Sequence, residues 1–124
     1  MLAPVIWAGE NTMRIIKCSE GITERQAFQI TKGGNLARMK DNVGRRFDIA
    51  DYIRYEDRRG DDEKEQQLLA IITAEGDVLS TNSGTIIRTF DAMIEQFDLP
   101  ITDVEIYSQT NPKNGRTYLN IALV

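Results

Sequence analysis

The chain has 124 residues, of which 15 are basic and 19 are acidic, and its formal net charge is −4. This length fits one domain, 1–124, because two halves would each be too small to bury a good core. The chain has no histidine and one cysteine, Cys18. These counts exclude an internal disulfide and a histidine base, and they disfavour a structural zinc site, which needs about four Cys or His ligands.

We expect neither a membrane helix nor a secretory signal. The longest apolar runs fall far short of the roughly 20 residues of a membrane helix, and the first residues lack the positive region of a secretory signal. We therefore expect a domain without cofactor, metal or membrane partner, in the cytoplasm. Because Cys18 has no histidine to activate it, we expect a small buried side chain rather than a nucleophile.

The first third of the chain, 1–44, is predicted to be a leader with a short helix and a basic loop. Thr23 and Gln26 have the spacing of a capping box, so a helix is expected at 24–30, with Phe28 among its core contacts. The densest basic stretch follows at 32–46. Its cations are Lys32, Arg38, Lys40, Arg45 and Arg46. This stretch is either a solvated surface or an arm that binds phosphates.

The next strand is predicted at 45–55, where apolar and polar residues alternate. Alternation places Phe47, Ile49, Ile53 and Tyr55 on a buried face, and Arg46, Tyr52 and Arg54 on a wet face. Segments 67–74 and 78–81 are expected to form a hairpin around the glycine turn at 75–77.

A helix is predicted after Ser83, which is a good N-cap. Ile86, Phe90, Met93, Ile94 and Phe97 form one apolar stripe at helical spacing, so we expect this helix to cover the core. Alternating strands are then expected at 101–109 and 116–124, joined by a turn-rich loop.

The resulting order predicts a mainly β protein with one or two helices. Five strands with a helix between strands 3 and 4 favour a closed five-stranded OB-fold barrel over residues 45–124. A ubiquitin-like or other α+β roll is the structural alternative.

Tyrosines and cations share the wet faces of the predicted strands. Bases of single-stranded nucleic acid stack on aromatic rings for about 1–3 kcal/mol each, while cations follow the phosphates. The tyrosines are Tyr52, Tyr107 and Tyr118, and the cations beside them are Arg46, Arg54, Lys113 and Arg116. The alternative interpretation is that these tyrosines only cover a half-exposed sheet.

The segment 47–124 contains the blocks FDIADYIRYEDRRGDDEKE, I-x-T-A-E-G-D-V-L-S, S-T-N-S, T-N-P-K-N-G and R-T-Y-L-N-I-A-L-V. In order and spacing it resembles the small single-stranded DNA-binding proteins of tailed bacteriophages, including the type of protein-primed replication systems. The upstream GITERQAFQITKGGNLARMKDNVG is similar to the leader of related phage proteins.

This resemblance implies a non-enzymatic OB-fold protein that coats single-stranded DNA without sequence preference during phage replication or recombination. It also implies the host cytoplasm as location, with replication or recombination proteins as possible partners. Tyr52 matches an aromatic position of the family, whereas Arg59 and Leu79 stand where the protein-primed type can carry aromatic residues.

Two other functions remain open. The segment 47–106 carries a net charge of −10, which suits a protein–protein interaction module, such as a phage regulator that mimics nucleic acid. A metal-dependent nuclease would use the acidic residues Asp57, Asp61, Asp62 and Glu63. Acidic clusters in loops are more commonly just solvated.

Overall fold

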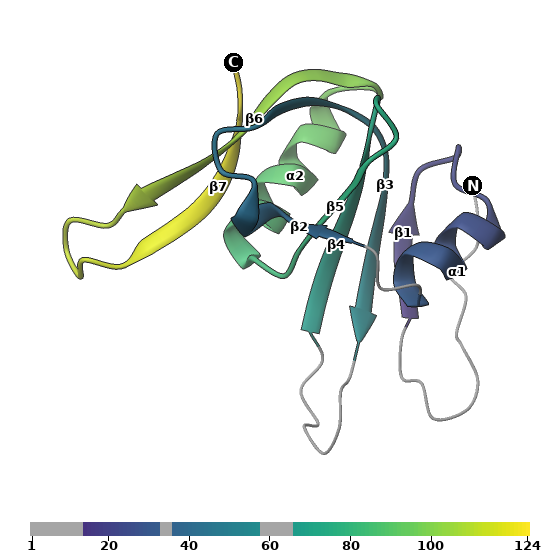
Figure 1. Ribbon diagram of the computed structural model, residues 1–124, viewed down its shortest axis with the longest axis horizontal. Coiled ribbons are helices and arrows are strands. Elements are labelled where there is room, and N and C mark those ends of the chain that lie inside the picture. Colours follow the sequence, from purple (N-terminus) through teal and green to yellow (C-terminus); the bar gives the residue numbers. More distant parts are fainter. Residues whose placement is uncertain (1–13, 33–35, 58–65) are drawn as a thin grey trace.

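The computed structural model describes residues 14–32, 36–57 and 66–124 (Figure 1). In chain order, its elements are β1 (Arg14–Cys18), α1 (Glu24–Lys32), β2 (Ala37–Arg38), the short 3-10 helix η1 (Met39–Asp41), β3 (Arg46–Asp57), β4 (Gln66–Thr73), β5 (Val78–Thr81), α2 (Gly84–Gln96), β6 (Ile101–Thr110) and β7 (Thr117–Leu123). Every helix and strand expected from the sequence overlaps one of these elements. The two strands of the leader, β1 and β2, were not expected.

One sheet of seven strands organises the molecule. The strands lie in the order β2-β5-β4-β3-β6-β7, and β1 pairs with the far half of β3. The sheet curls around α2 as an open half-barrel (Figure 1), and α2 packs against both β7 and β4. The protein is therefore mainly β with two helices, and α2 lies between β5 and β6.

The predicted closed five-stranded barrel is wrong. Closure would require β5 to pair with β7, but no such pair occurs in the described part of the chain. The reason lies in the leader: β2 runs parallel to β5, with Ala37 opposite Leu79 and Arg38 opposite Ser80. Because β2 occupies the outer edge of β5, that edge is not available to β7, and the barrel stays open.

Both faces of the sheet are buried. On the concave face, α2 covers a core that includes Ile49, Leu69, Ile71 and Phe90. On the opposite face, α1 covers a second core of Ile15, Cys18, Ile22, Ala27, Ile30, Ile53, Tyr55 and Ala70. The leader therefore supplies five of the eight residues of this second core, in addition to contributing two strands.

A β-bulge in β3 decides which side chains reach each core. The pairing of β3 with β4 shifts register between Ile49 and Asp51, and one extra residue sends the following side chains to the opposite face. Ile49 thus belongs to the α2 core, whereas Ile53 belongs to the α1 core. Tyr52, predicted on a wet face, joins the α2 core with an exposed fraction of 5 %.

Both helices begin as their sequences predict. The Thr23 backbone N–H donates to Gln26 Oε1 at 3.0 Å, and the Gln26 N–H donates to Thr23 Oγ1 at 3.1 Å, which completes the capping box. Ser83 Oγ accepts from the Ile86 N–H at 3.3 Å. The expectation that Phe28 and Phe97 are core residues is wrong, since their exposed fractions are 52 % and 42 %.

Candidate nucleic-acid interface

Tyr52 does not lie on a surface that a base could reach. Its ring packs edge-on against Phe90, with ring centroids 4.9 Å apart. Burial, with smaller contributions from Cys18 and Asp91, raises the pKa of the Tyr52 phenol above its ordinary value. The prediction that Tyr52 stacks on DNA is therefore wrong, because the bulge turns this side chain into the core.

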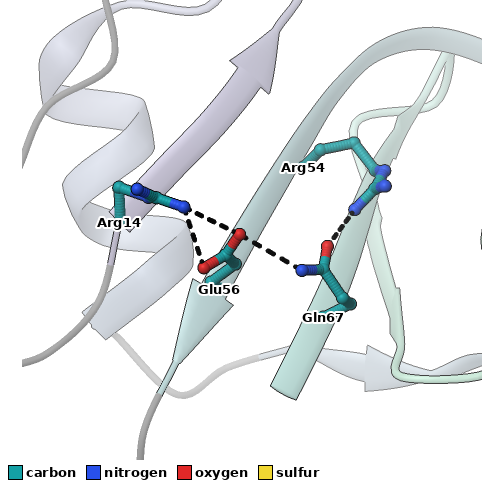
Figure 2. A network of polar contacts seen from close by, with 4 residues as sticks. All are labelled: Arg14, Arg54, Glu56 and Gln67. Atoms are coloured by element: carbon teal, nitrogen blue, oxygen red, sulfur yellow. Dashed lines mark hydrogen bonds and ion pairs between the residues drawn. The ribbon is translucent and has the colours of Figure 1, made fainter. Parts of the chain in front are cut away.

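Arg54 belongs to a polar network instead of a DNA-binding face (Figure 2). Its guanidinium donates to the two carboxylate oxygens of Asp91 on α2 at 3.1 and 3.2 Å. A third hydrogen bond, of 3.0 Å, runs to Gln67 on β4. Because its side chain is only 13 % exposed and already paired, Arg54 is a structural cation, and its predicted role beside DNA is not supported.

The network continues from Gln67 to the N-terminal strand. Gln67 Nε2 donates to Glu56 Oε1 at 3.2 Å, and Glu56 accepts two bonds from Arg14, of 3.0 and 3.1 Å. Figure 2 shows these side chains as one chain of contacts across β1, β3 and β4. This network joins three strands and α2, so its role is to stabilise the sheet and not to bind a ligand.

Arg45 and Arg46 are also ion-paired. The Arg45 guanidinium donates a hydrogen bond to the Asp77 carboxylate, and its Nη2 lies 3.8 Å from Glu75 Oε2. Arg46 Nε lies 3.3 Å from Glu105 Oε1, but its side chain is largely exposed. Exposed ion pairs contribute only about 0–1 kcal/mol, so a phosphate could compete for Arg46 more readily than for Arg45.

Two of the predicted cations line a groove of about 320 Å³, here called the basic groove. Its described lining residues are Arg38, Lys40, Gln66, Leu68, Ser80, Thr81, Asn82, Ser83 and Leu119, and none of them is acidic. Both cations are exposed, and within the described ranges neither forms an ion pair. Among the residues that the structure describes, no carboxylate therefore neutralises their charges.

The basic groove also offers short polar side chains. Ser80 and Thr81 end β5, and Asn82 and Ser83 lead into α2, whose first N–H groups carry a partial positive charge. The sequence predicts Ser83 as a helix cap and shows S-T-N-S as a block of the phage resemblance, but no residue of this segment was predicted to bind a ligand. The run S-T-N-S directly before a helix was the available signal, because such a run supplies several hydrogen-bonding groups near a helix N-terminus.

The hairpin formed by the ends of β6 and β7, residues 107–118, extends beyond the curled sheet (Figure 1) and is here called the hairpin arm. Tyr107 pairs with Asn120, and Tyr118 pairs with Gln109. Paired residues share a face, so the two tyrosines lie on one face at diagonal positions of neighbouring strands. Such diagonal neighbours are roughly 7–8 Å apart. The Tyr118 hydroxyl donates to Gln109 Oε1 at 2.9 Å, and this bond orients the ring.

The turn of the hairpin arm carries the other two predicted cations. Lys113 and Arg116 are both exposed and form no ion pair with any residue of the described ranges. The turn is shaped by Asn111, whose Oδ1 accepts from the Lys113 N–H, and by Gly115 at a positive φ of 70°. Leu119, at the base of the arm, faces the basic groove, so the arm and the groove adjoin.

Lys32 lies in the last turn of α1 and is not among the residues that line the basic groove. The eleven predicted nucleic-acid contacts thus separate into distinct groups. The structure brings together Arg38 and Lys40 in the groove, and Tyr107, Tyr118, Lys113 and Arg116 on the arm. It does not bring Tyr52, Arg54 or Lys32 to this surface, and Arg45 and Arg46 form ion pairs outside the basic groove.

The structure describes only one of the four acidic residues of the alternative nuclease site. Asp61, Asp62 and Glu63 lie outside the described residues, and Asp57 ends β3. The described ranges contain no group of three or more side chains positioned to hold a metal ion. Burial raises the pKa of the Cys18 thiol, which disfavours the reactive thiolate.

No protein-family model, curated protein or solved structure matches this chain. In the part of the chain that the structure describes, neither helix is long and apolar enough to cross a membrane.

Proposed function

We propose that this chain is a non-enzymatic protein that binds single-stranded DNA without sequence preference. One observation carries the proposal: the basic groove and the hairpin arm adjoin, and their four cations have no carboxylate partner in the described structure. Most other cations of the predicted set are held in ion pairs. A polyanion would therefore be attracted to this surface, although the whole chain is acidic.

The arm supplies what a single strand needs beyond charge. Tyr107 and Tyr118 share one face, and an unpaired base can stack on an aromatic ring whatever its identity. Bases inside a duplex are already stacked and are not available to these rings. The combination of free cations with surface tyrosines therefore favours single-stranded over double-stranded DNA.

The resemblance to phage single-stranded DNA-binding proteins supports the same function independently of the surface. On this proposal the protein coats and protects single strands during phage replication or recombination. The basic groove would hold the phosphates, and the arm would lie along the bases.

The test is titration of a fluorescently labelled oligothymidine with the protein, followed by anisotropy. The double variant R38A/K40A should bind about tenfold more weakly or worse, because each phosphate contact that is lost removes part of the electrostatic attraction. The double variant R25A/K32A is the matched control, because it also removes two cations. Arg25 and Lys32 lie on α1 and do not line the basic groove, so their loss should leave affinity nearly unchanged.

Equal losses in the groove variant and in the control would show that binding follows overall charge instead of this surface. If the parent protein gave no anisotropy change at low salt, the proposed function would be wrong.

A further inference from the structure

A second groove lies apart from the basic groove and shares no lining residue with it. It occupies about 830 Å³ and is lined by 17–21, 50–52 and 97–100, together with Ala74 and Ile94. These residues come from the end of β1, the bulge of β3 and the end of α2. We call it the apolar groove.

Phe97 gives this groove its apolar character. It is the C-cap residue of α2, and its exposed fraction is 42 %. Ile94, Leu99 and Pro100 continue the apolar surface beside it. Single exposed apolar residues are ordinary, but here four exposed or half-buried apolar residues line one groove, so we take this cluster as the starting point for an interaction site.

The charges around the apolar groove are opposite to those of the basic groove. Its lining includes the carboxylates Glu20, Asp51 and Asp98, against one cation, Lys17. Asp51 is held in place by a 2.8 Å hydrogen bond from Ser19 Oγ. A polyanion such as DNA is repelled here, and a ligand that carries positive charge is attracted.

We propose that the apolar groove binds a segment of a partner protein in which large apolar side chains are flanked by lysine or arginine. The apolar side chains would pack on Phe97 and Leu99, and the cations would face the three carboxylates. Because this groove and the basic groove have no residue in common, the partner and DNA could be bound at the same time.

The probe is a short synthetic peptide with leucine and phenylalanine between lysines, labelled for anisotropy. Two matched peptides have glutamate in place of lysine, or serine in place of the apolar residues. We expect only the first peptide to saturate. Phe97→Ser should weaken its binding about tenfold, and Asp98→Lys should weaken it about fivefold.

Phe28→Ser is the matched control, because Phe28 is an exposed phenylalanine of α1 that does not line this groove. It should bind the peptide like the parent protein. Peptide and oligothymidine are titrated in separate experiments, because a lysine-rich peptide binds DNA directly, so a failure of peptide binding and a failure of DNA binding are seen separately.

Four results would overturn the proposal. Absence of peptide binding would show that the groove does not hold such a segment. Binding that Phe97→Ser and Asp98→Lys leave unchanged would show that the peptide binds outside this groove. Tighter binding of the glutamate peptide would contradict the charge argument. Self-association of the parent protein that Phe97→Ser abolishes would show that a second copy of this chain occupies the groove instead.

Discussion

Tyr52 and Arg54 stand two residues apart on β3, and both side chains serve the interior of the molecule. Tyr52 packs on Phe90, while Arg54 ties β3 to α2 through Asp91. A phenol and a guanidinium can be buried in this way because each keeps the form that its surroundings favour, the phenol neutral and the guanidinium paired.

Tyr52 predicts a specific dependence of stability on pH. Its folded-state pKa is raised above its ordinary value of 10.0, so its contribution to stability is fully present below that value and is lost as pH rises through the folded-state pKa. The melting temperature of the parent protein should therefore fall more steeply between about pH 9 and 12 than that of Tyr52→Phe. Parallel curves would contradict the assignment.

Arg54 predicts a loss of stability without a loss of DNA binding. Arg54→Ala removes two hydrogen bonds to Asp91 and one to Gln67, and should lower the free energy of unfolding by about 1–3 kcal/mol. Arg46→Ala, which breaks an exposed pair, should lower it by less than about 1 kcal/mol. Urea denaturation measures both, and equal effects would contradict the structural role given to Arg54.

For single residues, the sequence predicts which side chains are buried better than it predicts the face of the sheet on which they lie. Alternation correctly predicts that Phe47, Ile49, Ile53 and Tyr55 are buried. It cannot show that a bulge sends the first two and the last two to opposite faces, because nothing in the local residue pattern marks the extra residue. The misplacement of Tyr52 and Arg54 follows from that one position.

At the scale of elements, α2 is the best-predicted part of the fold. Its cap at Ser83 is confirmed, and Ile86, Phe90 and Met93 are buried as the helical spacing predicts. The predicted apolar stripe is wrong at Phe97. The helix ends at Gln96, and the backbone of Phe97 is extended, so its side chain does not continue the helical face. Helical spacing predicts a face only as far as the helix continues.

Phe90 predicts how strongly α2 is anchored. Its side chain is fully buried, so Phe90→Ala leaves a cavity and should lower the free energy of unfolding by about 3–5 kcal/mol. Phe97→Ala, at the exposed end of the same stripe, should change it by less than about 1 kcal/mol. Chemical denaturation separates the two, and a Phe90→Ala protein of unchanged stability would show that α2 packs elsewhere.

The hairpin arm predicts a loss of DNA affinity that salt does not modify. Tyr118→Ala should weaken oligothymidine binding by about 1–3 kcal/mol, and Tyr118→Phe should be close to neutral, because the ring stacks and the hydroxyl only orients it. The dependence of affinity on salt should be the same in both variants, since a stacked base releases no counterion. A parent-like affinity of Tyr118→Ala would exclude stacking on this ring.

At the scale of the whole molecule, the distribution of charge matters more than its sum. The net charge of −4 argues against a nucleic-acid partner, yet the basic groove and the arm together hold four exposed cations that form no ion pair within the described ranges. Sequence counts do locate the basic stretch 32–46, but they cannot show which of its cations are neutralised. Arg45 and Arg46 find carboxylates that lie far along the chain, so only the folded structure separates them from Arg38 and Lys40.

Salt titration tests this distribution. If the four free cations each contact a phosphate, log affinity should fall against log salt with a slope of about −3, at roughly −0.7 per phosphate on single strands. The R38A/K40A variant should reduce the slope to about half of that value, because two of the four contacts are gone. A slope near zero in the parent protein would show that phosphates are not contacted.

The parallel pairing of β2 with β5 has a further consequence, for the order in which the chain can fold. The Ser80 hydroxyl donates to the Ala37 carbonyl at 3.3 Å across this pairing, although the two residues are 43 positions apart in the sequence. Strand β1 likewise pairs with a strand that is made later, β3. On the ribosome, β1 therefore has no partner until β3 has been made, and β2 has none until β5 has been made. Contacts of such long sequence separation slow folding, so we expect refolding in milliseconds to seconds, with β2 pairing last with a hairpin of β4 and β5 that can form early.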